Sequence, residues 1–180
     1  MKKLRKLLED RMKEKLPLIL KSLRSGTSDY KDLIDDELLN YEGTTGSLLN
    51  TAARDGHIEA VMYFVEKGVD PNRQHEGYRN NSLEWAVSEG HYDIAEYLLG
   101  IGVELNQISP LADPVMSAAS NGDLKMINLL HEHGADLSIV YSGFCDVFKV
   151  DYTNKSAINA ANKNGHTDVV AFLNSVDSLE

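Results

Sequence analysis

The sequence predicts an all-α solenoid in which short helix pairs stack side by side. Four segments align without gaps, and they begin at Leu49, Leu83, Val115 and Ile158. One glycine recurs in every segment, with spacings of 34, 32 and 43 residues: Gly56, Gly90, Gly122 and Gly165. Apolar residues follow a helical period after that glycine, which is typical of a repeat built from helices.

Each unit follows the same physical logic. A short helix of small residues comes first, and in the first unit Ala52 and Ala53 allow neighbouring backbones to approach closely. The repeated glycine supplies the left-handed conformation that ends a helix. A second, amphipathic helix follows. In three units another glycine ends it, at Gly68, Gly102 and Gly134. One pair cannot bury its apolar face alone, so neighbouring pairs must stack.

We predict repeats over about residues 43–75, 76–107, 108–150 and 151–180. The third is longer because about ten residues are inserted near 141–150. The fourth has no second glycine and is expected to be a C-terminal capping repeat. Residues 1–42 are predicted to form a helical N-terminal cap, in which Pro17 starts a further turn and Ser28 caps a later helix.

These segments resemble the ankyrin-repeat family, whose pattern is roughly T-P-L-H-x-A-A-x-x-G-H, a second helix, and L-L-x-x-G-A-D-x-N. The matching stretches are AARDGH with EKGVDPN, AVSEGH with GIGVELN, AASNGD with HEHGADLS, and AANKNGH. The T-P-L-H opening is replaced by SLLN, NSLE, DPVM and SAIN, which brings the turn before each first helix into question. The resemblance covers about residues 43–180. It implies stacked helix-turn-helix units with loop or β-hairpin fingers, and a protein–protein interaction module.

Charge is spread unevenly along the chain. The net charge of −10 disfavours nucleic acid as a partner, because phosphate binding relies on clustered Lys and Arg. Residues 1–24 hold nine basic and three acidic residues, a net of +6, whereas the remainder holds nine basic and 25 acidic residues, a net of −16. The acidic array predicts a protein partner with a basic surface. The basic face of the leading helix is interpreted as solvated or paired with the array, with a membrane-surface or targeting role as the alternative.

Two further observations concern the compartment. The longest apolar stretch near the N-terminus, residues 16–20, is too short for a membrane span or a secretory signal. A single cysteine, Cys145, excludes an intrachain disulfide. We therefore expect a cytoplasmic protein.

The sequence predicts no enzyme, no cofactor and no metal site. His57, His91 and His166 follow the repeat glycine, where the family places a structural histidine, and we expect local hydrogen bonds at the start of the second helix. His131 and His133 lie two positions apart and point in different directions, whereas zinc requires three or four nitrogen or sulfur ligands. Cys145 lies in an apolar stretch and is interpreted as a buried or contact-forming thiol, since a nucleophile would need a base and oxyanion donors nearby.

Binding is expected in a groove lined by the first helices and by the loop fingers. By the family's pattern, the groove positions are those just before each repeat glycine: Arg54, Asp55, Ser88, Glu89, Ser120, Asn121, Lys163 and Asn164. The first finger is expected to contribute His75, Glu76, Tyr78 and Arg79.

The inserted stretch IVYSGFCDVFKV is too apolar for a surface loop without a function, and it predicts a short hairpin around its Ser-Gly pair, residues 142–143. Aromatic residues in this stretch and just after it are expected to contact the partner: Tyr141, Phe144, Phe148 and Tyr152. The alternative is that the finger folds back and buries them against its own repeats. Trp85 is predicted to pack between repeats, with a groove anchor as the alternative.

The biological role stays open between several possibilities. A non-enzymatic adaptor, inhibitor or regulator is the leading one. The others are an immunity protein that neutralises a cognate toxin, as some small stand-alone bacterial ankyrin proteins do, and a secreted host-directed effector. A monomer is favoured.

Overall fold

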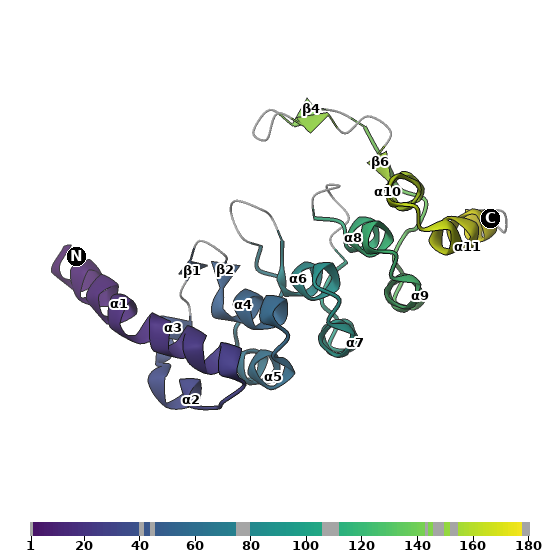
Figure 1. The fold of residues 1–180 in the computed structure, drawn as a ribbon. Coiled ribbons are helices and arrows are strands. Elements are labelled where there is room, and N and C mark those ends of the chain that lie inside the picture. Colours follow the sequence, from purple (N-terminus) through teal and green to yellow (C-terminus); the bar gives the residue numbers. More distant parts are fainter. Residues whose placement is uncertain are drawn as a thin grey trace.

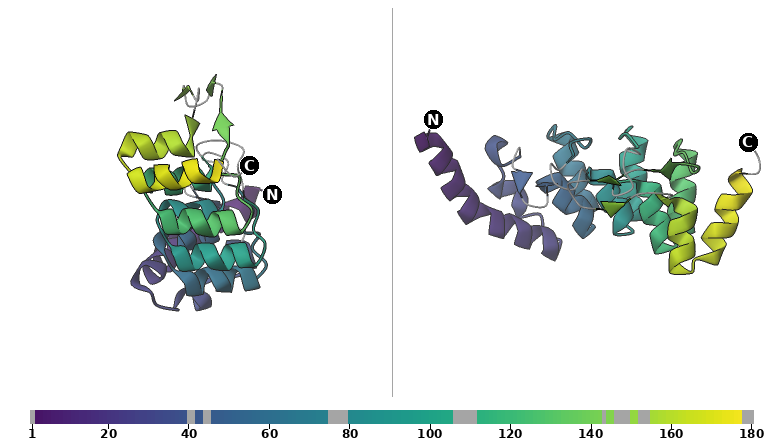
Figure 2. Two further views of the ribbon diagram at one scale, coloured as in Figure 1. Left: turned by 90° about the vertical axis from the view of Figure 1, so that its right-hand side faces the viewer. Right: turned by 90° about the horizontal axis from the view of Figure 1, so that it is seen from above.

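In the computed structural model, helix pairs stack into an elongated solenoid (Figure 1). The structure describes residues 2–39, 42–43, 46–74, 80–105, 112–142, 144–145, 150–151 and 155–177. The two ends of the chain lie at opposite ends of the array (Figure 2). In this part of the chain no helix is both long enough and apolar enough to cross a bilayer.

Two rows of helices form the array, and within the described ranges they make four pairs. The first helices are α4 (Leu48–Asp55), α6 (Ser82–Ser88), α8 (Pro114–Asn121) and α10 (Ala157–Asn164). The second helices are α5 (Ile58–Glu66), α7 (Tyr92–Gly100), α9 (Leu124–Glu132) and α11 (Thr167–Asp177). The core lies between the rows, where Leu83, Ile94 and Leu130 are completely buried. The predicted all-α repeat solenoid is confirmed.

Each first helix begins with a side-chain cap, although the T-P-L-H opening is lost. Ser47, Asn81, Asp113 and Ser156 each accept a hydrogen bond from a backbone N–H of the first turn. Asn81 also forms a reciprocal capping box with Glu84. All four replacements are residue types that cap helices well. The turn that the sequence brought into question is therefore kept by different side chains.

The N-terminal segment folds as α1 (Lys2–Ser25), α2 (Tyr30–Leu33) and α3 (Asp36–Leu39). Two expectations for it are wrong. Helix α1 continues through Pro17, because Ile19 and Leu23 beyond it are buried in the core and offset the lost backbone hydrogen bond. Ser28 does not cap α2: Asp29 holds the N-cap position and makes no side-chain cap.

Short strands form the fingers. Strand β1 (Glu42–Gly43) pairs antiparallel with β2 (Gly46–Ser47) before the first repeat. In the inserted segment, β3 (Val140–Tyr141) pairs with β6 (Lys155–Ser156), and further out β4 (Phe144–Cys145) pairs with β5 (Val150–Asp151). These two antiparallel pairs confirm a hairpin in the insertion, which projects beyond α10 on the first-helix side (Figure 1). The expected turn at residues 142–143 is wrong, because β3 and β4 on either side of it pair with β6 and β5 and not with each other.

Candidate protein-binding face

The residues predicted to line the groove lie at the C-terminal ends of the first helices. We call the solvent side of α4, α6, α8 and α10 the first-helix face. Its side chains differ in burial: Glu89, Asn121, Lys163 and Asn164 are exposed, whereas Arg54, Asp55, Ser88 and Ser120 are half-buried. The structure thus brings the predicted positions into one row, with only half of them fully open to solvent.

Two of the predicted groove residues also join neighbouring repeats. The Asn121 side-chain amide donates a hydrogen bond to the Ser88 carbonyl at 2.9 Å. The Asn164 amide donates in the same way to the Ser120 carbonyl at 2.7 Å. Carbonyls in the last turn of a helix have no partner inside that helix. The next repeat supplies the missing donors.

The repeat histidines act across the same boundary. His91 Nε2 lies 2.9 Å from the Arg54 carbonyl, and His166 Nε2 lies 3.0 Å from the Ser120 carbonyl. The expectation of local bonds at the start of their own helices is wrong for these two, because each ring reaches back to the preceding repeat. The ring also covers that repeat's glycine: a Cβ added to Gly56, which has a φ of 81°, would lie 2.6 Å from His91 Cε1. The glycine is therefore needed for space as well as for its conformation.

Large side chains fill the junction between repeats 1 and 2, which we call the filled junction. The Arg54 guanidinium lies 5.9 Å from the centroid of the Trp85 ring and donates to Asp55 Oδ1 at 2.9 Å. Asp55 also faces Arg24 of α1 at 3.8 Å. Trp85 is half-buried and packs against the core, which confirms its predicted place between repeats. Side chains at this junction are largely occupied with one another.

A pocket of about 380 Å³ opens between repeats 3 and 4, and we call this the open junction. Helix α8 contributes Met116 and Ser120, and the rest of the lining comes from Lys155 of β6 and from Asn159, Ala160, Lys163 and Asn164 of α10. Ser120 occupies the repeat position of Arg54, and Ala160 occupies that of Trp85. Small side chains therefore leave space where larger ones close the equivalent site.

The base of the inserted finger is tied to the third repeat. The Tyr141 hydroxyl donates a 2.7 Å hydrogen bond to Asp113 Oδ2. Burial, followed by this bond to Asp113, raises the pKa of Tyr141 well above its ordinary value. Asp113 Oδ1 meanwhile caps α8 by accepting from the backbone N–H of Val115 and Met116. Tyr141 therefore anchors the finger, and for this residue the structure agrees with the alternative in which the finger contacts its own repeats.

Several predicted contact residues cannot be placed on this face. His75, Glu76, Tyr78, Arg79, Phe148 and Tyr152 lie outside the described residues. The backbone of Phe144 belongs to β4, and its side chain lies outside the described part of the chain. Their role in binding stays a prediction.

A buried carboxyl group lies beneath the first-helix face. Glu84 is 1% exposed, and its Oε2 accepts the Asn81 backbone N–H at 2.7 Å. Burial, with a smaller contribution from the nearby Asp113 carboxylate, raises the pKa of Glu84 to about 8. The group is therefore mostly protonated at neutral pH. Its role in the capping box is structural.

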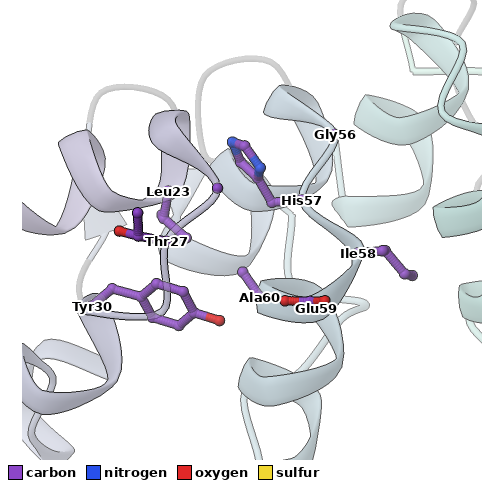
Figure 3. Close-up of a pocket in the computed structure, with 9 residues that line it drawn as sticks. Leu23, Thr27, Tyr30, Gly56, His57, Ile58, Glu59 and Ala60 are labelled. Carbon is purple, nitrogen blue, oxygen red and sulfur yellow. The ribbon is translucent and has the colours of Figure 1, made fainter.

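A second pocket, of about 210 Å³, lies where the N-terminal segment meets the first repeat (Figure 3). His57 lines it from the start of α5, opposite Leu23 and Thr27 (Figure 3). Beneath it Tyr30 packs on Tyr63 and Phe64, with ring centroids 5.6 and 5.9 Å apart. Burial, with the Glu59 and Tyr63 charges adding to it, raises the pKa of Tyr30. This aromatic contact, which joins α2 to α5, was missed at the sequence level.

Exposed acidic side chains gather on the second helices rather than on the first-helix face. They include Glu59, Glu66, Asp93, Glu96, Glu132 and Asp168. The exposed lysines of the described second helices and their C-caps are Lys67, which follows α5, and Lys125 of α9. Among the residues that the structure describes, no three His, Cys, Asp or Glu side chains are placed to hold a metal ion. Most exposed acidic side chains of the paired helices thus lie on the second helices, and Glu89 is the exposed acid among the described groove positions.

Comparisons with known proteins agree with this geometry. A family model described as ankyrin repeats in three copies matches residues 14–109. The chain is 31% identical over 136 residues to cyclin-dependent kinase 4 inhibitor B of Bos taurus, covering 76% of this chain and 95% of that protein. The Mus musculus protein of the same name is 30% identical over 131 residues, covering 73% and 93%.

A shorter match concerns L-asparaginase of Dirofilaria immitis, with 41% identity over 56 residues. It covers 31% of this chain and only 8% of that protein, so it does not extend to the whole of that protein. The family match, in contrast, begins inside α1, where Gly26 with a φ of 66° follows α1 as Gly56 follows α4. From the helix pairs, the paired glycines and these matches together, the chain belongs to the ankyrin-repeat family and is a protein-interaction module.

Proposed function

We propose that this chain holds a protein partner across its first-helix face and acts as an adaptor, inhibitor or regulator without performing chemistry. The observation that carries the proposal is the row of exposed polar side chains one repeat apart, formed by Glu89, Asn121 and Asn164. Such a row presents an extended surface, and stacked repeats commonly use surfaces of this kind for recognition.

The relatives support the inhibitor role within this proposal. Cyclin-dependent kinase 4 inhibitor B is by its name an inhibitor of a protein enzyme, and nearly its whole length aligns with this chain. Binding to a partner enzyme, rather than turnover of a substrate, is the mode of action that we extend to this chain. The single cysteine of the sequence favours the cytoplasm as the place where it acts.

A matched pair of substitutions in the second repeat tests the face. Glu89 is the C-cap of α6 on the first-helix face and Glu96 lies on α7, and both are exposed. Partners are captured from the source cells, identified by mass spectrometry, purified and titrated by calorimetry. We expect Glu89→Arg to weaken binding by about tenfold or more, while Glu96→Arg leaves it within about twofold. The reverse result would place the partner on the second helices.

The fingers extend the proposed surface. Phe144, Phe148 and Tyr152 in the insertion, and His75, Glu76, Tyr78 and Arg79 in the first finger, are the proposed contacts. Because the Tyr141 hydroxyl holds the finger to Asp113, the test keeps Tyr141 and changes Phe144 and Phe148 to Ser. Weaker capture with unchanged helical content supports a contact role. Unchanged capture would leave the first-helix face as the binding surface.

The acidic second helices support a more specific alternative. Their exposed carboxylates attract a basic protein, since complementary fields speed encounter. An immunity protein that neutralises a basic toxin would use such a surface. Co-expression with the product of a neighbouring gene tests this role: the chain should rescue growth, and the Glu96→Arg variant should rescue it less well.

A further inference from the structure

We propose that the open junction binds an acidic side chain, set in an apolar stretch, from an extended segment of the partner protein. The inference rests on the proposed function, because it names the chemistry that one part of the first-helix face selects. The occupant is a peptide carboxylate, flanked by apolar residues, that enters between α8 and α10.

Side-chain size creates the space. At the filled junction Arg54 of repeat 1 lies over Trp85 of repeat 2. At the same positions of repeats 3 and 4 the chain has Ser120 and Ala160, and a pocket of about 380 Å³ remains. The helices on both sides of the pocket continue the same array, and small side chains occupy both repeat positions there.

The lining combines an apolar floor with a basic rim. Met116 is only 9% exposed and forms the floor together with the half-buried Ala160. The side chains of Lys155 and Lys163 are exposed at the rim. Among the described residues that line this pocket there is no aspartate or glutamate. An ammonium pair above an apolar floor favours a carboxylate carried between apolar side chains.

The pocket is continuous with the inserted finger. Lys155 belongs to β6, which pairs with β3 in a register that places Tyr141 opposite Lys155. The hydrogen bond from Tyr141 to Asp113 holds that strand pair on the third repeat. One rim lysine is therefore positioned by the finger and the other by α10, so the two rim charges come from separate elements on two sides of the entering segment.

Net charge decides which anion suits this site. The chain carries −10, so nucleic acids and other polyanions are repelled at long range. A single carboxylate within an otherwise neutral peptide is repelled only weakly, and it can still pair with the ammonium groups of Lys155 and Lys163. The Ser120 hydroxyl, in the same pocket, offers it a hydrogen-bond donor.

The test uses nuclear magnetic resonance on the full ¹⁵N-labelled chain. The probe is the capped peptide Gly-Leu-Glu-Leu-Gly, and its control has Gln in place of Glu. We expect saturable shifts of the amide signals of α8 and α10 with the Glu peptide. We expect about fivefold weaker binding of the Gln peptide, and weaker binding of the Glu peptide at high salt. Equal affinity for the two peptides, or no saturable shift of α8 and α10 with the Glu peptide, would overturn the inference.

Two double variants separate the pocket from general charge. Lys155→Glu with Lys163→Glu should abolish the preference for the Glu peptide. Lys21→Glu with Lys67→Glu makes the same change in net charge at exposed positions away from the pocket and should keep it. If both double variants lose the preference for the Glu peptide over the Gln peptide, the proposal is wrong. Should the first pair reduce helical content, Lys155→Gln with Lys163→Gln removes the charges without reversing them and must also lose the preference.

A filling variant provides an independent check. Ala160→Trp places at the open junction the residue type that Trp85 has at the filled junction. Because Ala160 is only half-buried, the array should stay folded, and the indole should fill the pocket and prevent peptide binding. Binding that survives this change would contradict the proposed location. A partner protein that depends on Glu89 but ignores the rim lysines would overturn this inference alone and leave the proposed function standing.

Discussion

The filled and open junctions occupy equivalent places in the array and differ in almost every physical property. At the filled junction the Arg54 guanidinium lies over Trp85 and donates to Asp55 Oδ1, so the Arg54 charge is paired within the array. At the open junction small residues leave a hollow, and two lysines face solvent above it. The backbone framework is shared. The comparison teaches that side-chain size at two repeat positions separates a closed junction from one with a hollow, which is the binding site that we propose.

The buried acid of the second repeat gives the largest effect that distinguishes the two junctions. Glu84 has a pKa of about 8 when folded, above the ordinary value of 4.5, so the folded state keeps a proton that the unfolded state loses. Its stabilising contribution is complete below about pH 4.5 and is lost as pH rises to about 8. The resulting change in unfolding free energy reaches about 5 kcal/mol.

Glu84→Gln should therefore flatten the fall in unfolding free energy between these pH values. Urea titrations at several pH values measure it. Glu89→Gln, at an exposed position of the same repeat, should behave like the parent protein. Parallel pH curves for the parent and the Glu84 variant would contradict the buried proton. The equivalent positions at the open junction are Met116 and Asn159, which carry no titratable group.

Removing the ring at the filled junction should be the next largest effect. Trp85→Ala deletes a half-buried indole that packs on the core and lies under Arg54, and we expect a loss of about 3 kcal/mol. Ala160→Ser at the open junction should change stability by less than about 0.5 kcal/mol. Denaturant midpoints at constant m value measure both. Similar losses at the two sites would remove the contrast between the junctions.

The glycines under the histidine rings allow a finer comparison. Gly122 and Gly90 have φ values of 73° and 77°, so alanine strains the backbone similarly at both. At Gly122 a Cβ would also collide with the His166 ring, whereas at Gly90 nothing lies within 4 Å. We expect Gly122→Ala to lower the unfolding free energy by about 2 kcal/mol and Gly90→Ala by about 1 kcal/mol. Thermal melts that rank Gly90→Ala as the worse variant would count against the stacked ring.

The histidines themselves should give the smallest effect. His91→Ala removes the side-chain donor of the Arg54 carbonyl, and a loss of about 1 kcal/mol is expected. His166→Ala should lose less, because the Asn164 amide still donates to the Ser120 carbonyl. Adding Asn164→Ala to His166→Ala should bring the loss to at least that of His91→Ala. Additivity of the two single changes would show that the donors do not replace each other.

Local patterns predicted the array because they act over a few residues. Three signals depend only on residues close in sequence: the apolar spacing after Gly56, the glycine after each first helix, and the β-branched and aromatic residues of the insertion. The structure confirms the helices and a hairpin in the insertion. Ser47 and Asp113 show that a degraded motif still caps a helix, since capping depends on residue type rather than on one consensus.

Long-range contacts could not be derived in the same way. His91 meets Arg54, and Tyr141 meets Asp113, across 37 and 28 positions of the sequence. Such pairs depend on how far neighbouring repeats rotate and on which rotamers the packing allows. At Pro17 the local sequence predicted a break in the helix, but the helix continues because the burial of Ile19 and Leu23 outweighs the effect of the proline. The contents of a junction, and therefore the candidate site, had to come from the structure.

The carbonyls at the ends of the first helices have a consequence for synthesis on the ribosome. Each of these carbonyls accepts a hydrogen bond from a side chain of the following repeat. His91 donates to Arg54, Asn121 donates to Ser88, and both Asn164 and His166 donate to Ser120. Because translation proceeds from the N-terminus, each emerging repeat completes the one made before it. The nascent chain therefore gains its final stability with a lag of one repeat.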